Sequence, residues 1–208
     1  MRRILMVFFA ITVIAGCKTQ NEESIQTKGT ERTIEKKGEW GTMKVSFPVY
    51  NNQYADSVIH NFTSGLISEF MKYTKNAVED EMKYEMTVSY EEFFAKPGIV
   101  SVVFNIYEYT GGAHGNTFIQ SLVLDSKNNK KLDLSDFVKP EQFTKVRSVV
   151  RKKLKEMLEY DESIEEGTSS PEDFSAFAVT NDKIIFWFSP YQVASYADGT
   201  QKVEISRE

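Results

Sequence analysis

The sequence contains few of the residues on which metal sites and nucleophilic enzymes depend. Its 208 residues include one cysteine, Cys17, and two histidines, His60 and His114. A single cysteine has no disulfide partner within the chain, and a zinc site usually takes about three ligands from histidine, cysteine or carboxylate. No serine stands in a G-x-S-x-G context, and no carboxylate pair is singled out. We therefore expect no metal, no cofactor and no catalytic residue.

A strong excess of one charge is also missing. The net charge is −5 at pH 7, both signs are interspersed, and there is no basic block. Nucleic acid is therefore not an expected partner. One predicted helix does carry a basic face, which could attract an acidic polymer but is more often simply solvated. Its residues are Lys145, Arg147, Arg151, Lys152, Lys153 and Lys155.

One long apolar run is present, Ile4–Ala15, and it follows two arginines. A basic start, a short apolar run and small residues after it are typical of a secretory signal. The run is too short for a membrane-spanning helix, which needs about 20 apolar residues. Ile14-Ala-Gly-Cys17 resembles the bacterial lipoprotein signal, in which the cysteine is lipidated. We expect a lipoprotein signal peptide over residues 1–16 and acyl groups such as palmitate on Cys17. The alternative is an ordinary signal peptide with an incidental cysteine.

The segment after Cys17 is polar. Residues 17–38 are rich in Glu, Lys, Thr and Gln and poor in apolar side chains. Such a segment buries too little surface to offset its ordering entropy, so we predict a flexible tether. Residues 39–208 then form a single domain of ordinary size.

Hydrophobic periodicity predicts an α+β fold for this domain. An antiparallel meander carries two main amphipathic helices, 52–77 and 140–157, with either Asn51 or Asn52 as the cap of the first. His60 falls in the first helix and is expected at its surface. The acidic run 161–166 is expected to form an irregular loop. The predicted strands are 40–49, 83–93, 99–109, 117–125, 131–134, 174–180, 183–189 and 201–206.

A glycine-rich insert separates two of these strands. Gly111, Gly112 and Gly115 permit positive φ and close backbone approach, and the insert also carries His114. Three interpretations stay open: a tight loop held by its own histidine, a recognition loop, or a catalytic loop. As a recognition surface the candidate binding residues are Tyr107, Tyr109, Gly111, Gly112, His114 and Gly115, with Tyr191, Tyr196 and Asp198 from a later loop.

Three separated patterns follow one another along the chain: Tyr109-Thr-Gly-Gly-Ala-His-Gly115, Leu124-Asp-Ser…Lys131-Leu-Asp-Leu-Ser-Asp-Phe137 and Phe186-Trp-Phe-Ser-Pro-Tyr-Gln-Val-Ala-Ser-Tyr-Ala-Asp-Gly199. Together they resemble the envelope domain shared by lysozyme-sensing anti-sigma factors and the N-terminal part of some peptidoglycan deacetylases. In the first group this domain lies outside the cell and binds lysozyme. In the second, catalysis belongs to a separate domain.

The resemblance implies an exported binding domain. We find no cytoplasmic segment and no spanning helix, so an anti-sigma role is not expected. The function we expect is that of a lipid-anchored envelope protein with a non-catalytic binding domain. Its partner would be an envelope glycan such as peptidoglycan, or a secreted hydrolase such as lysozyme. The alternatives are an enzyme that acts on envelope glycan through His114, as a hydrolase or deacetylase, and a purely structural envelope protein.

Overall fold

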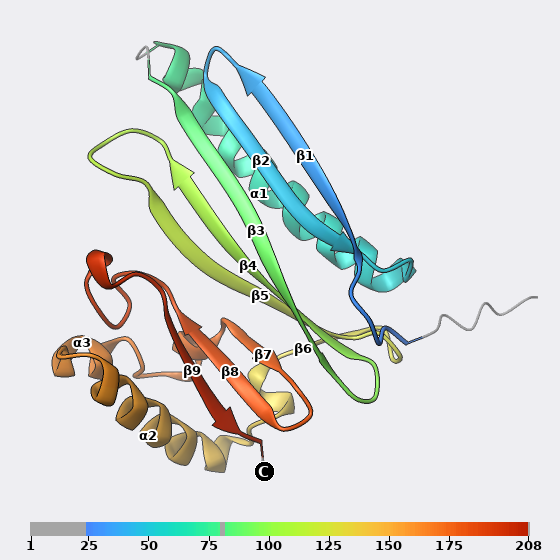
Figure 1. Ribbon diagram of the computed structural model, residues 1–208, viewed down its shortest axis with the longest axis vertical. Coiled ribbons are helices and arrows are strands. Elements are labelled where there is room, and N and C mark those ends of the chain that lie inside the picture. Colours follow the sequence, from blue (N-terminus) through green and yellow to red (C-terminus); the bar gives the residue numbers. More distant parts are fainter. Residues whose placement is uncertain (1–23, 80–81, 208) are drawn as a thin grey trace, which may run out of the picture.

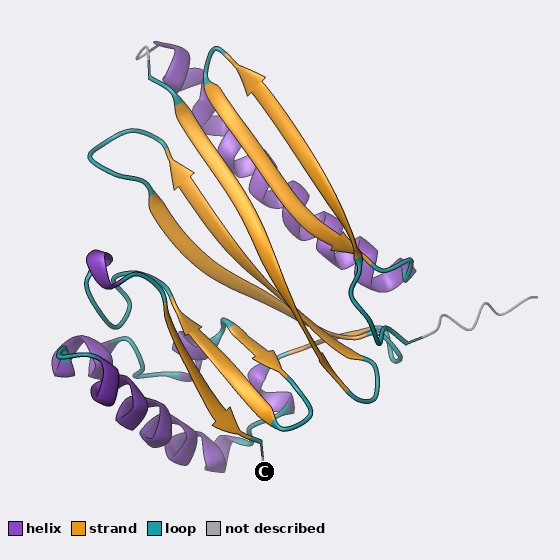
Figure 2. Cartoon of the chain, in the orientation of Figure 1, coloured by secondary structure: helices purple, strands orange, loops and turns teal. Residues whose placement is uncertain are grey.

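A computed structural model describes residues 24–79 and 82–207. The predicted signal peptide and the predicted lipidation site, Cys17, lie outside the described residues. The described chain forms two sheets and two main helices, which confirms the α+β prediction (Figure 1, Figure 2). Within these two ranges no helix combines the length and the apolar character needed to cross a bilayer.

The larger sheet has six strands in sequence order, β1 to β6. Neighbouring strands are antiparallel except β2 and β3, which run parallel. Strands β3 to β6 therefore form the expected meander, whereas the parallel pair departs from it. The strands are β1 (Thr30–Gly38), β2 (Gly41–Val49), β3 (Tyr84–Ala95), β4 (Ile99–Tyr109), β5 (Asn116–Asp125) and β6 (Lys130–Leu132).

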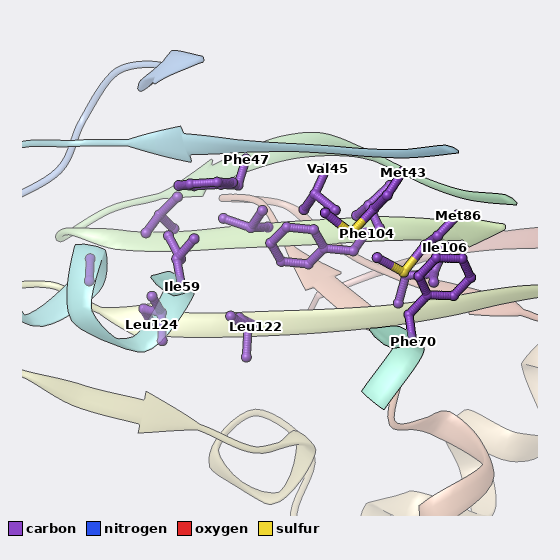
Figure 3. Close-up of a cluster of buried hydrophobic side chains, with 14 of the residues drawn as sticks. Met43, Val45, Phe47, Ile59, Phe70, Met86, Phe104, Ile106, Leu122 and Leu124 are labelled. Atoms are coloured by element: carbon purple, nitrogen blue, oxygen red, sulfur yellow. The ribbon is translucent and has the colours of Figure 1, made fainter. Parts of the chain in front are cut away.

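Helix α1 (Gln53–Glu79) connects β2 to β3, and this crossover is why the two strands run parallel. The Asn52 side chain caps the helix by accepting a hydrogen bond from the Ala55 N–H at 2.9 Å. His60 is exposed on this helix, as expected. The helix covers one face of the sheet and buries a cluster of apolar side chains there (Figure 3). The cluster includes Met43, Val45, Phe47, Ile59, Phe70, Met86, Phe104, Ile106, Leu122 and Leu124.

The smaller sheet has three antiparallel strands, β7 (Phe177–Val179), β8 (Lys183–Phe188) and β9 (Gln201–Ser206). Helix α2 (Pro140–Met157) packs on one face of this sheet, and its Val150 and Leu154 are fully buried. Short 3₁₀ turns at Leu134–Asp136, Pro171–Phe174 and Tyr196–Asp198 occupy the connections. The sheet residues in contact with this core include Phe177, Val179, Ile184, Phe186, Phe188, Val203 and Ile205.

The other face of the smaller sheet packs against the larger one. Ala178, Ile185 and Trp187 meet Val103 and Ile119 in a third apolar cluster. Strand β8 is therefore buried on both faces, as its continuous apolar run predicts. The layers run α1, six-stranded sheet, three-stranded sheet, α2.

Serine hydroxyls join the two sheets. The backbone N–H of Val179 donates to Ser101 Oγ at 3.0 Å, and that of Phe177 donates to Ser121 Oγ at 2.9 Å. Strand β7 pairs only with β8 in its sheet, so these N–H groups lie on its outer edge. A buried N–H without an acceptor is costly, and the two serines of the larger sheet satisfy both groups.

The tether prediction is wrong for residues 30–38, which form strand β1. All but Ile34 are exposed, so burial does not hold the strand; backbone pairing with β2 through a two-residue hairpin does. The preceding segment is also fixed: the Ile25 N–H donates to Ser126 Oγ at 2.8 Å beside the β3–β4 turn, and the Ile25 side chain is buried. Charged side chains along β1 blunt a free sheet edge.

The acidic run is not irregular either, since Asp161–Glu166 forms helix α3. Its single apolar residue, Ile164, is fully buried in the core under α2. Arg151 forms an ion pair with Glu165, and Lys155 Nζ lies 3.1 Å from the same carboxylate. Arg151 and Lys155 of the predicted basic face are therefore turned toward α3.

We predict that Ser101→Ala destabilises the protein by about 1–3 kcal/mol, because it leaves the buried Val179 N–H without an acceptor. Urea unfolding of the full chain measures the change in the free energy of unfolding. The control is Ser89→Ala, an exposed serine on the same face of the sheet, which should cost less than about 0.5 kcal/mol. Equal losses in the two variants would contradict the role given to the hydroxyl.

Candidate functional site

The glycine-rich insert forms the loop between β4 and β5. Gly111 and Gly112 have φ of +98° and +94°, a region that side chains with a Cβ rarely adopt. The Tyr109 hydroxyl donates to the Gly112 carbonyl at 3.1 Å and closes the loop on itself. Gly115 is required for another reason: a Cβ there would lie 2.5 Å from ring atoms of Tyr107. The loop is thus shaped by the two tyrosines that precede it.

His114 is brought against two tyrosines of the β8–β9 connection. Its ring stacks on that of Tyr196, with centroids 4.2 Å apart and planes 26° from parallel. The Tyr191 ring lies 5.6 Å from that of Tyr196 and 6.5 Å from that of His114. We call His114, Tyr191 and Tyr196 the aromatic cluster. Both loops that supply it stand at the left of Figure 1.

One carbonyl orders the cluster. His114 Nδ1 lies 2.8 Å from the Gly115 carbonyl oxygen, and the Tyr196 hydroxyl donates to the same oxygen at 3.0 Å. A carbonyl oxygen only accepts hydrogen bonds, so this contact requires a hydrogen on Nδ1. In the neutral imidazole ring Nε2 then carries no hydrogen. This is the scaffold role that the sequence left open for His114. The histidine nevertheless remains exposed, so its ring both holds the loop and forms part of the surface.

Tyr191 is presented outward. It is 63% exposed, and its φ of +69° is unusual for a residue with a side chain. The next residue anchors the turn, since Gln192 Nε2 donates to the carbonyls of Gly167 and Asp173 at 3.1 and 2.8 Å. A rigid base therefore supports an exposed ring, which is the usual arrangement of a recognition residue.

The hydrogen bonds of the Asp198 carboxylate are to residues outside the aromatic cluster. Its carboxylate accepts a hydrogen bond from Ser195 Oγ, which lowers the pKa of Asp198, and Tyr160 contributes a second hydrogen bond. Gln201 Nε2 donates to its backbone carbonyl at 2.7 Å. Asp198 thus shapes the 3₁₀ turn that carries Tyr196. Among the residues described, no group of three or more His, Cys, Asp or Glu side chains is placed to hold a metal ion.

A cleft of about 300 Å³ lies between the two sheets. Its floor includes Val103 and Ile119, and Trp187 and Lys202 come from the smaller sheet. Lys202 Nζ lies 5.0 Å above the Trp187 ring, within the range of a cation–π contact. The other lining residues carry polar groups: Ser89, Tyr90, Glu91, Asn105 and Thr200. Because side chains alternate along a strand, Tyr107 follows Asn105 on the same sheet face, toward the aromatic cluster.

Sequence reasoning missed this cleft. The alternation in β3 does reveal a polar face opposite the buried face of Tyr84, Met86 and Val88. It does not show that a second sheet crosses part of that face and leaves the rest open. The aromatic cluster was predicted as a set of candidate contacts, and the structure brings His114, Tyr191 and Tyr196 together. Tyr107, Tyr109 and the glycines give the loop its shape.

Comparison with known proteins places this fold. Residues 34–117 match the domain family described as deacetylase PdaC, and residues 135–208 match DUF3298, a family of proteins of unknown function. The chain therefore carries a domain of the PdaC/DUF3298 type, in agreement with the resemblance carried by the three sequence motifs.

The chain is also similar in sequence to individual proteins. The chain is 30% identical over 183 residues to the peptidoglycan-N-acetylmuramic acid deacetylase PdaC of Bacillus subtilis, covering 84% of this chain but only 39% of that protein. It is 24% identical to immunogenic protein MPB64 of Mycobacterium bovis, over 99% of this chain and 95% of that protein.

Two crystal structures share the fold. A DUF3298 family protein from Pseudomonas aeruginosa gives a TM-score of 0.65 at 16% identity, and a DUF3298 member from Bacteroides fragilis gives 0.58 at 17%. Each comparison covers 86% of this chain and 90% of the other. At these identities the likeness concerns the fold alone.

The ring stack predicts an NMR signature. Protons over the face of a neighbouring ring are shifted upfield, so the His114 ring protons should be shifted upfield by Tyr196. In Tyr196→Ala the chemical shifts of these protons should return toward those of an exposed histidine. Tyr196→Phe retains the ring, loses only the hydrogen bond to Gly115, and should retain most of the shift. Identical spectra for the two variants would contradict the stacked geometry.

Proposed function

We propose that this domain is a non-catalytic binding module of the cell envelope and that its ligand is a peptidoglycan-type glycan. The observation that carries the proposal is the aromatic cluster, in which His114 and Tyr191 are exposed and Tyr196 is half-buried, together with the cleft between the two sheets. The relation to PdaC, whose name specifies peptidoglycan N-acetylmuramic acid as its target, supports the choice of ligand. The chain spans 39% of that protein, and the deacetylase activity of the whole protein is no part of this proposal.

The chemistry of the surface suits a sugar chain. Aromatic faces are electronegative and attract the polarised C–H groups on a sugar ring. The exposed rings of His114 and Tyr191 offer such faces, and the half-buried ring of Tyr196 stacks on that of His114. The cleft adds carboxylate, amide, hydroxyl and ammonium groups that can exchange hydrogen bonds with sugar hydroxyls and N-acetyl groups. A few polar groups at fixed positions beside apolar surface are what small-ligand sites use to orient a ligand.

The same surface gives less support to catalysis. A hydrolase or deacetylase that used His114 as its base would need a group to orient the imidazole and a nucleophile or metal-bound water. In the described chain Nδ1 of His114 contacts a backbone carbonyl, and the neighbouring rings are tyrosines. Asp198, the carboxylate of the connection that supplies Tyr191 and Tyr196, accepts a hydrogen bond from Ser195.

A protein partner is the second candidate. Tyr191 is an exposed ring on a turn fixed by Gln192, and tyrosine next to serine and glycine is the composition of many protein-binding loops. This observation favours a secreted hydrolase of the lysozyme type as an alternative ligand. Both candidate ligands would contact the same cluster. Variants of the cluster therefore test whether this surface binds a ligand, and binding assays with peptidoglycan and with lysozyme test which ligand it is.

We predict that Tyr191→Ala and Tyr196→Ala each lower the affinity of the full chain for insoluble peptidoglycan by about tenfold, since central aromatic contacts are commonly worth more than 1 kcal/mol. Co-sedimentation at several protein concentrations measures the affinity. The matched control is Tyr73→Ala, a half-exposed tyrosine on helix α1, which should bind like the unmodified chain.

The contrary outcomes are distinct. Undiminished sedimentation of both cluster variants would remove the surface from the proposal. Absence of peptidoglycan binding together with capture of lysozyme, lost in Tyr191→Ala and retained in Tyr73→Ala, would replace the glycan by the protein partner. Release of acetate or cleaved fragments by the full chain, abolished in His114→Ala, would favour the enzymatic alternative.

Envelope location by a lipid anchor is a further part of the proposal. The full chain expressed in a bacterial host should incorporate labelled palmitate and sediment with membranes, whereas Cys17→Ser should do neither. A double variant, Cys17→Ser with Thr19→Cys, keeps a cysteine nearby but removes it from the lipoprotein context, and it should also remain unlabelled. Equal labelling of the unmodified chain and Cys17→Ser would rule out this anchor.

A further inference from the structure

A second concave surface lies on the other side of the smaller sheet. It is a groove of about 480 Å³ that is lined by residues of helix α2 and strands β8 and β9, near the end of the described chain. Figure 1 shows where these three elements lie. This volume falls in the range of small-molecule sites. The groove shares no lining residue with the cleft between the sheets. It is therefore separate from the surface assigned to the envelope ligand.

The floor of the groove is apolar. Val150 and Leu154 of α2 are fully buried in the core, but Val149 is 39% exposed and Val146 is half-buried, and both line the groove. The apolar stripe of α2 is thus wider than the sheet beneath it covers. Phe137, Val138, Ile184 and Ile205 continue the same apolar lining.

The rim of the groove is positive. Four cationic residues, Lys145, Lys153, Lys183 and Arg207, line it with a single carboxylate, Glu204, so the lining has three positive charges in excess (four minus one). Lys183 Nζ lies 2.8 Å from the Glu204 carboxylate. The Arg207 guanidinium lies 5.3 Å over the Phe137 ring, at the boundary between rim and floor. The excess contrasts with the net charge of −5 of the whole chain.

The opposite flank of α2 differs. There Arg147 donates to the Ser169 carbonyl at 2.9 Å, and Arg151 and Lys155 meet Glu165 of α3. That flank is a structural contact between helices. The groove side combines uncovered apolar surface with cations, and only a ligand that carries both an apolar chain and an anion complements both features.

We propose that this groove binds a single-chain anionic amphiphile, of which a fatty acid is the simplest. The alkyl chain lies along Val146, Val149 and Ile205, and the carboxylate lies at the rim near Lys153. Burial of the chain supplies most of the affinity, because surface charges contribute little to binding strength. The positive rim supplies the selectivity for an anionic head.

The test uses the full chain, with methyl groups of Val and Ile labelled for NMR, titrated with decanoate below its micelle concentration. The Val149 and Ile184 methyl signals should shift with saturation. Octanoate should bind roughly ten- to fifteenfold more weakly, at about three- to fourfold per methylene lost. Decanol and decyltrimethylammonium have the same chain without the anion, and we expect each to bind at least about fivefold more weakly than decanoate.

Adjacent lysines provide a matched pair of variants. Lys153→Gln should weaken decanoate binding by about threefold or more. Lys152→Gln removes the same charge from a side chain that is not part of the groove lining and whose Nζ lies 3.9 Å from Glu156; it should bind decanoate unchanged. Val149→Asn should weaken binding without a change of charge, and Tyr191→Ala should leave it intact, which separates this site from the aromatic cluster. Thermal melts check that every variant folds.

Four results would overturn the proposal. Equal weakening in the Lys152 and Lys153 variants would indicate general charge attraction. Equal binding of decanoate and decyltrimethylammonium would deny a role for the rim. Adsorption to anionic vesicles that decanoate does not displace would indicate a membrane-facing surface. Loss of a dimer in Val149→Asn, seen by sedimentation velocity, would identify a second copy of the chain as the occupant.

Discussion

The outer-edge N–H groups of β7 need hydrogen-bond acceptors, and the hydroxyls of Ser101 and Ser121 on the larger sheet provide them. This requirement, together with the packing of Trp187 and Ile185 on Val103, fixes how the two sheets lie on one another. The Ser189 hydroxyl accepts a hydrogen bond from the Ile119 N–H at 3.0 Å and extends the same junction toward the loops. Tyr196 can stack on His114 because this junction sets the distance between the loops.

The aromatic cluster therefore depends on the frame and contributes little to it. Its residues stand on connections between strands, and hydrogen bonds to backbone carbonyls hold each connection; the buried side chain of Val193 also anchors the β8–β9 connection. Gly115 shows how tightly the parts are coupled: its carbonyl faces His114 Nδ1 and accepts a hydrogen bond from Tyr196, and its missing Cβ makes room for the Tyr107 ring. Such a surface can present three rings in one arrangement without binding a partner first.

Much of the fold follows from local patterns in the sequence. The apolar residues of α1 recur with helical spacing, β8 has a continuous apolar run, and Asn52 caps a helix, so each element could be predicted. Strand β1 could not, because its side chains are exposed and its pairing with β2 is a property of the backbone. Helix α3 likewise depends on one buried residue, Ile164, and on ion pairs to a helix that precedes it.

The candidate sites show the same division. His114, Tyr191 and Tyr196 were found by composition, because histidine and tyrosine beside glycine are conspicuous in a loop. Lys202 and Trp187 were missed, because nothing local indicates that the smaller sheet packs on the polar face of β3 and β4. Lys153 belongs to a basic face that is visible in the sequence, but only the packing of α2 separates it from Lys152, whose neighbour in space is Glu156.

The fixing of residues 24–29 beside the β3–β4 turn has a geometric consequence. The Ile25 N–H is bound to Ser126 at one end of β4, whereas the glycine-rich loop follows Tyr109 at the other. Eleven residues of β4 at about 3.3–3.4 Å each separate the two ends by about 35 Å. Any upstream attachment to a surface thus joins the domain at its base and leaves His114, Tyr191 and Tyr196 at the tip, facing away from that surface.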